Sequence, residues 1–164
     1  MKTLEIKCKT LEKKDMEKLF NILQRAIAEG MPELRLTDED YGQLETQEDR
    51  YPVTFPCVLL AVPEVAWTEL AGGAQRGTAT VITRLAVDCY HDTHHGSGTE
   101  EETARRQQMR TRLHRLLQGR KPLFGCGALV RRKSRDYSLP GGIKVYETEY
   151  ELTVADTPGT VSRR

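Results

Sequence analysis

The sequence predicts an α+β protein in which two helices pack on one face of a small antiparallel sheet of about four strands. Two segments place apolar residues at helical spacing, and two pairs of segments have the alternating, β-branched pattern of hairpin strands. Their order, helix–hairpin–helix–hairpin, favours helices segregated to one face of the sheet. The chain has 164 residues, so we expect one domain over 14–156, an N-terminal arm over 1–13 and a flexible tail over 157–164.

The first helix is predicted after Asp15, which can cap its N-terminus, and it ends at Gly30, shortly before Pro32. Its apolar residues form one stripe that must pack on another element. The stripe consists of Met16, Leu19, Phe20, Leu23, Ala26 and Ile27. Residues 31–52 are acidic and weakly periodic, which indicates a surface loop rather than a core element, although a short strand could form around 33–36.

The middle of the chain carries the clearest strand pattern. A strand is expected at 57–62, with a kink or bulge at Pro63 because proline cannot donate to a ladder, and it continues through Trp67. The glycine-rich residues 71–77 predict a turn or loop. In the next strand, 78–90, side chains alternate between two faces. One face holds Ala79, Val81, Thr83, Leu85, Val87 and Cys89, and the other holds Thr80, Ile82, Arg84, Ala86, Asp88 and Tyr90. The second face is amphiphilic, which indicates contact with solvent or another subunit.

A second helix is predicted from Thr99, which forms a capping box with Glu102, to about Gln118, and Gly119 ends it. Its buried stripe consists of Met109, Leu113, Leu116 and Leu117. Its outer face is basic and consists of Arg105, Arg106, Arg110, Arg112 and Arg115.

The chain closes with a predicted hairpin, with strands at 127–137 and 143–154 and a turn at 138–142. In the returning strand, one face holds Lys144, Tyr146, Thr148, Tyr150, Leu152 and Val154, and the other holds Glu147, Glu149 and Glu151. The opposing strand carries Arg131, Arg132, Lys133 and Arg135. Metal-dependent nucleases also use carboxylates on strands, so the three glutamates of the returning strand could have this role. Ion pairing with the basic residues of the opposing strand is the simpler interpretation.

Composition narrows the function classes. The 25 Lys and Arg residues nearly balance 24 Asp and Glu, which gives a net charge of +1 and excludes the usual basic nucleic-acid binder. The sequence contains no apolar run long enough to span a membrane and no signal-like N-terminal stretch, so we expect a cytoplasmic protein. The cysteines, Cys8, Cys57, Cys89 and Cys126, form no CxxC pair, which argues against structural zinc and disulfides. Cys57 and Cys126 are expected to be buried or half-buried.

The sharpest chemical motif is the run from Cys89 to His95, in which His91, His94 and His95 could bind a transition metal. The run enters a Gly/Ser loop without a distant partner motif, so solvated histidines are the favoured interpretation. Ser97 lies in G-S-G and not in a nucleophile elbow, and no phosphate loop is present. We therefore expect no enzyme activity, no metal and no cofactor.

The hairpin over 55–90 and the elements that follow it resemble the bacteriophage tail-terminator family of tail-completion (minor tail) proteins. The features that carry the resemblance are Pro56, Pro63, Trp67, Gly73, Gln75 and Gly77, followed by a long strand. A helix at 99–118 and a hairpin at 127–154 complete the outline. The resemblance covers about Asp15 to Asp156, and the acidic insert at 36–50 departs from it.

The resemblance implies a structural role in the tail of a phage or prophage virion. Such proteins assemble in the host cytoplasm into rings, commonly hexamers, that cap the tail-tube protein and join it to the head–tail connector protein. DNA is only passing cargo in the ring, and no membrane is involved. The alternatives are another phage neck or head-completion protein, or a small metal-dependent enzyme that uses His91, His94 and His95.

Charged residues are segregated along this chain, which favours self-assembly through opposite patches and predicts that assembly is sensitive to salt. The candidate contacts to other subunits or to the tube are Gly73, Gln75, Arg76, Arg84, Arg105, Arg112, Arg131, Lys133, Arg135, Glu147, Glu149 and Glu151.

Overall fold

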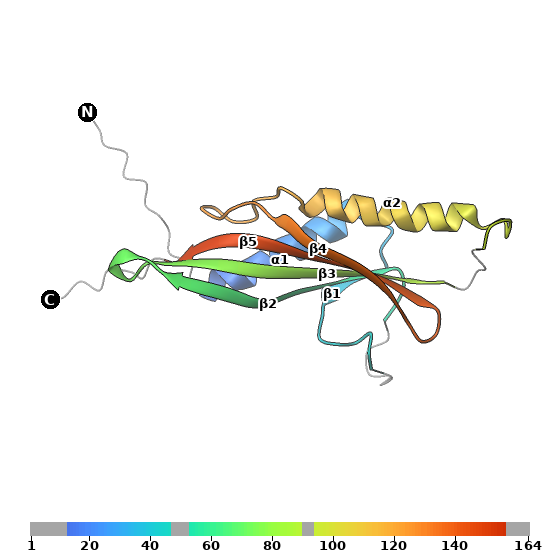
Figure 1. The fold of residues 1–164 in the computed structure, drawn as a ribbon, viewed down its shortest axis with the longest axis horizontal. Coiled ribbons are helices and arrows are strands. Elements are labelled where there is room, and N and C mark those ends of the chain that lie inside the picture. Colours follow the sequence, from blue (N-terminus) through green and yellow to red (C-terminus); the bar gives the residue numbers. More distant parts are fainter. Residues whose placement is uncertain (1–12, 47–52, 90–93, 157–164) are drawn as a thin grey trace, which may run out of the picture.

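The computed structural model describes residues 13–46, 53–89 and 94–156, and Figure 1 shows their arrangement. The helices are α1 (Lys13–Gly30) and α2 (Glu100–Leu117), and the strands are β1 (Leu36–Glu39), β2 (Cys57–Glu69), β3 (Gln75–Asp88), β4 (Val130–Leu139) and β5 (Ile143–Asp156). The strands form a 5-stranded sheet in the order β1-β2-β3-β5-β4, which is antiparallel except for the β1–β2 pair. The predicted α+β class is confirmed, with one strand more than expected. The predicted tail, and the arm except for Lys13, lie outside the described residues.

The helix α1 begins at Lys13, so the predicted N-cap at Asp15 is wrong and this residue lies in the first turn. Acidic residues are also favoured there by the helix dipole. The apolar stripe is confirmed, because Leu19, Leu23 and Ile27 are fully buried. The helix ends at Gly30, as predicted.

Both helices pack on the same face of the sheet, and the main core fills the space between these two layers. This core includes Leu19, Leu23, Ile27, Val58, Leu60, Val81, Leu85, Met109, Leu113, Leu117, Tyr150 and Leu152. The predicted faces of β3 and β5 are confirmed, since their core-facing residues alternate with Arg84 and the Glu147, Glu149 and Glu151 row. We call the side of the sheet that carries this row the open face.

At the N-terminus of α2, the predicted capping box is wrong. Thr99 is the N-cap residue but makes no capping hydrogen bond through its side chain, and its hydroxyl oxygen lies 2.8 Å from Ser97 Oγ. Acidic residues in the first turn provide a favourable interaction with the helix dipole instead. These residues are Glu100, Glu101 and Glu102.

The predicted irregularity at Pro63 is confirmed, because the β2–β3 register shifts between Ala61 and Glu64. The strand β3 starts at Gln75 rather than at 78, so the predicted loop is shorter than expected. A turn at Ala71–Gly73 closes it, and Leu70 N–H donates to Ala74 O over 2.7 Å.

The last hairpin is displaced relative to its prediction. The strand β4 runs over Val130–Leu139 rather than 127–137, because residues before it pair with the end of α2. Gly119 N–H donates to Leu129 O over 2.8 Å, and Leu129 N–H donates to Arg120 O over 2.9 Å. The predicted turn and the alternation of β5 are otherwise as expected.

The acidic insert contradicts its prediction as a loop without core residues. A smaller apolar cluster lies on the open face, near the β4–β5 turn. It consists of Cys57, Leu59, Ala86 and Val145, with Leu36, Leu44, Val53, Phe55, Tyr137, Leu139 and Ile143 packed against it. The insert therefore covers one end of the open face.

Candidate functional site

Arg84 lies on the open face of β3 and is only 9% exposed. Its Nε and Nη2 atoms donate to the two carboxylate oxygens of Asp40, each over 2.5 Å. Its Nη1 atom donates to Glu45 and, over 3.2 Å, to the Tyr137 hydroxyl oxygen. We call these four side chains the Arg84 cluster, which ties the insert to β3 and β4.

Burial alone would lower the pKa of Arg84, but hydrogen bonds to Asp40 and Glu45 outweigh this effect and raise it. The guanidinium therefore stays charged and serves as a fixed anchor inside the protein. Its predicted interface role stays a prediction. The sequence did contain a signal for the cluster, because an arginine in an apolar strand needs acidic partners and the insert is rich in them.

The predicted ion pairing between β4 and β5 is confirmed at two places. Arg132 Nε donates to Glu151 over 2.6 Å, and Arg135 donates to both oxygens of Glu147 over 2.7 and 3.2 Å. Such exposed pairs contribute only about 0–1 kcal/mol each. Within the described part of the chain, Arg131 and Lys133 make no ion pair, although both are exposed.

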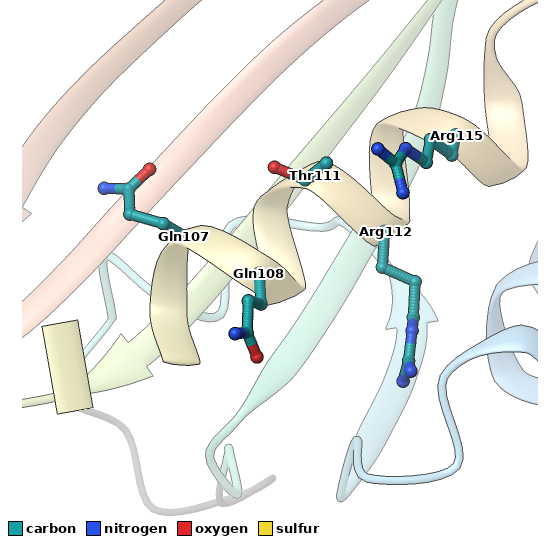
Figure 2. Close-up of a pocket in the computed structure, with 5 residues that line it drawn as sticks. All are labelled: Gln107, Gln108, Thr111, Arg112 and Arg115. Carbon is teal, nitrogen blue, oxygen red and sulfur yellow. The ribbon is translucent and has the colours of Figure 1, made fainter. Parts of the chain in front are cut away.

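The basic face of α2 is partly neutralised by acidic residues of the same chain. Arg112 Nη1 lies 2.9 Å from Glu33, and Arg110 Nη1 lies 3.1 Å from Asp136. Figure 2 shows the side chains of this helix that line a surface pocket. They belong to Gln107, Gln108, Thr111, Arg112 and Arg115.

Arg106 differs from the other arginines of α2, and its placement on the outer face was wrong. It is half-buried and turns towards the end of β3, where its Nη1 donates to Cys89 Sγ over 2.6 Å. Its Nε is buried without a hydrogen-bond partner in the described structure. The helix therefore presents fewer free cations than its sequence indicates.

The β2–β3 hairpin extends past the ends of β1 and β4 (Figure 1). This follows from the pairing, since β1 reaches only Leu60 and β4 begins level with Glu151 of β5. We call residues 64–80 the hairpin arm. Its two large apolar side chains, Trp67 and Leu70, are each 43% exposed.

Gly77 allows the hairpin arm to pack closely against β5. A Cβ atom at this position would lie 2.7–2.8 Å from side-chain carbons of Val154, Trp67 and Val65. Real Cβ contacts are not this short, so glycine gives the Trp67 ring the space to lie over β3. The glycine is thus required by packing.

The predicted contact residues do not form one continuous surface. Gly73, Gln75 and Arg76 lie on the hairpin arm, and Arg105 and Arg112 lie on α2 in the other layer. The remaining residues lie on the open face or the β4 edge, including Arg131, Lys133, Arg135, Glu147, Glu149 and Glu151. The sequence interpretation missed Phe124, which is 84% exposed between α2 and β4.

His94 and His95 are exposed, whereas His91 lies outside the described residues. Within the described ranges, no three His, Cys, Asp or Glu side chains are placed to hold a metal ion. Neither of the described helices is long and apolar enough to cross a membrane. Cys57, Cys89 and Cys126 are free thiols, with Cys57 buried and Cys126 half-buried, as predicted.

Burial raises the pKa of the Cys57 thiol to about 12 and that of the Tyr150 hydroxyl to about 12. Both groups stay protonated in the folded state at pH values where the unfolded chain loses these protons, so stability falls as pH rises above about 9.

We expect alkaline unfolding between about pH 9 and 12. Between pH 8 and 11, the urea midpoint of the Cys57→Ala variant should fall less than that of the native protein. Cys126→Ala is the control. Equal slopes of midpoint against pH for all three proteins would contradict this prediction.

No family model matches the sequence, and no curated protein matches it. A solved structure does share the fold: it is a chain in the "Virion of native gene transfer agent (GTA) particle". The two chains are 9% identical, with a TM-score of 0.53, over 84% of this chain and 91% of the other. This chain is therefore similar in fold, over most of its length, to a protein of a gene transfer agent virion.

Proposed function

We propose that this protein is a structural component of a phage-like virion and that it acts as a tail terminator. In this role, copies of the chain form a ring that caps the tail tube and joins it to the head connector. The observation that carries the proposal is the shared fold with a gene transfer agent virion chain, which extends over 84% of this chain and 91% of that one. Nearly complete coverage of both chains indicates the same domain rather than a shared fragment.

The surfaces of the subunit support an assembly role. Basic side chains on β4 and acidic side chains on the hairpin arm lie at opposite edges of one sheet, and opposite edges are what a head-to-tail contact uses. Complementary charge at such a contact sets its orientation. The exposed Trp67 and Leu70 add apolar area of the kind that contacts bury.

A ring can stop the growth of a tube by simple geometry. One ring face must match the end of the tube, and the other must lack the interface that the tube repeats. A head-to-tail contact that closes produces such a ring with two different faces. The subunit then needs no chemical reaction, and its work is done by shape and charge.

The test combines the assembly state with function on tubes. Multi-angle light scattering across concentrations should show a closed oligomer that weakens at high salt, because screening reduces attraction between exposed charges. Electron microscopy of tubes polymerised with the protein should show shorter tubes with a ring at one end. A protein that stays monomeric and caps no tube would contradict the proposal.

A matched comparison separates the tail terminator from a neck or head-completion protein. Pull-downs with purified tube protein and purified connector protein should both be positive for a tail terminator. Binding to the connector alone would keep the virion role and exclude the tail-terminator role.

A further inference from the structure

The sheet has two edges that are open among the described residues, and they differ in character. At one edge, β4 pairs with β5 only. At the other, β1 covers Cys57–Leu60 of β2, which leaves residues 64–69 paired with β3 alone. The β4 edge carries exposed arginines and a lysine, whereas the open part of β2 carries Glu64 and Glu69.

We propose that β4 of one subunit pairs, antiparallel, with residues 64–69 of β2 in a second copy of this chain. The sheet then continues from subunit to subunit. This inference specifies the ring contact and rests on the proposed function only for the closure of the chain of subunits into a ring.

Strand direction allows this contact to repeat. The strands β2, β3, β5 and β4 alternate in direction, so β4 runs opposite to β2 within each subunit. A neighbouring copy in the same orientation therefore offers β2 antiparallel to β4. Each contact leaves the next edge open for another copy, which is the requirement for a heterologous ring.

The faces of the sheet restrict the register. Both copies must keep their helices on the same side, so the neighbour must shift along the strands by an even number of residues. A shift of four overlaps the neighbour's β1 with the end of β4. Within one subunit, Leu139 at the end of β4 is level with Asp88 of β3, and Glu39 at the end of β1 is level with Thr83 of β3. A shift of six residues is therefore the smallest even shift that moves the neighbour's Glu39 beyond Leu139.

This register gives the strands the tilt of a curved sheet. Six residues correspond to a shift of about 20 Å along the strands, and four strands are about 19 Å wide. The resulting strand tilt is about 45° from the ring axis, at the upper end of the roughly 35–45° typical of closed β-barrels. The six-residue shift between β4 of one copy and β2 of the next is thus of the size that closing the sheet into a ring requires.

The side chains brought together in this register are complementary. Glu69 lies opposite Arg131, which makes no ion pair among the described residues, and Thr68 lies opposite Lys133. Glu64 lies diagonal to Arg135, within reach of its long side chain. Gln118 Oε1 already accepts the Arg131 backbone N–H over 2.9 Å, so backbone pairing starts at Lys133.

The test is a pair of cysteines placed at facing positions of the two edges, Thr68→Cys with Lys133→Cys in one chain. Both positions are exposed and lie on the open face. Mild oxidation of the oligomer, alone or on tubes, should give a disulfide ladder of trimers and larger species on a non-reducing gel. Each single variant should give no ladder, and mass spectrometry should find the 68–133 link.

The outcomes separate this inference from the proposed function. Rings that form without a 68–133 link would overturn the edge contact while leaving the tail-terminator role intact. A ladder from a protein that caps no tube would support the contact and contradict that role. Products that stop at dimers would show an isologous contact and overturn the inference.

Charge reversal provides an independent readout. Glu69→Arg or Arg131→Glu alone should weaken association roughly fivefold, because each places like charges opposite one another. The two changes combined should restore it. Arg115 is exposed on α2, so Arg115→Glu is the matched control and should leave association unchanged. If the combined Glu69→Arg and Arg131→Glu variant does not regain association, this register is wrong.

Discussion

Arg84→Met is expected to lower the free energy of unfolding by about 3–5 kcal/mol, because it leaves a buried carboxylate without its cation. The side chain of Asp40 is only 9% exposed, and Arg84 supplies two hydrogen bonds to it. Glu45 and Tyr137 lose a partner in the same step. The melting temperature should fall by roughly 6–20 °C for a chain of this size.

Urea unfolding followed by circular dichroism measures this effect. Arg25→Met is the matched control, since Arg25 is exposed on α1 and its loss should cost less than about 0.5 kcal/mol. Removing both charges, with Arg84→Met and Asp40→Asn, should cost less than the sum of the single changes. A stability of Arg84→Met close to that of the native protein would show that the insert is not anchored by this cluster.

Gly77→Ala is expected to destabilise the protein by about 1–3 kcal/mol through overpacking. The added methyl group would lie 2.7–2.8 Å from carbons of Val154, Trp67 and Val65, so at least one of these side chains must move. Trp67 is partly exposed at 43% and has the most freedom to leave. We therefore also expect the emission of Trp67, the single tryptophan of the chain, to shift to longer wavelength.

A double-mutant cycle checks the cause. If the clash with the indole ring contributes, Gly77→Ala and Trp67→Ala together should cost less than the sum of the two single changes. If the two changes in the free energy of unfolding simply add, the added methyl group clashes only with Val154 and Val65. An unchanged stability in Gly77→Ala would show that the hairpin arm adjusts without loss.

Periodicity predicted the elements that bury one continuous stripe or face. The stripes of both helices and the alternation of β3 and β5 follow directly from which positions are apolar, because each element has one partner layer. The bulge at Pro63 was predictable because a missing N–H interrupts a ladder locally. Helix starts were less predictable, since several residue types can interact favourably with the free N–H groups of the first turn. Asp15 lies inside its helix instead of capping it, and Thr99 makes no capping hydrogen bond through its side chain.

The insert could not be predicted by these means, because its structure depends on residues distant in the sequence. Asp40 and Glu45 are ordinary acidic residues in their own segment, and only the buried Arg84, far along the chain, gives them a partner. The side chain of Asp40 is buried beside it, whereas that of Glu45 stays half exposed. The same holds for Arg106, which lies on a basic helix face in sequence but meets Cys89 in space. The residues of the proposed subunit contact present the greatest difficulty, since the proposal gives them partners in another copy.

The proline in β2 has a further consequence for the exposed edge of this strand. An exposed strand edge is a template for uncontrolled pairing, and proteins protect such edges with prolines, bulges and charges. Pro63 offers no N–H and coincides with the register break between Ala61 and Glu64, while Glu64 and Glu69 repel a second copy of the same edge. Features of this kind protect proteins against fibril growth, and they leave a basic strand edge such as that of β4 as the partner that charge favours.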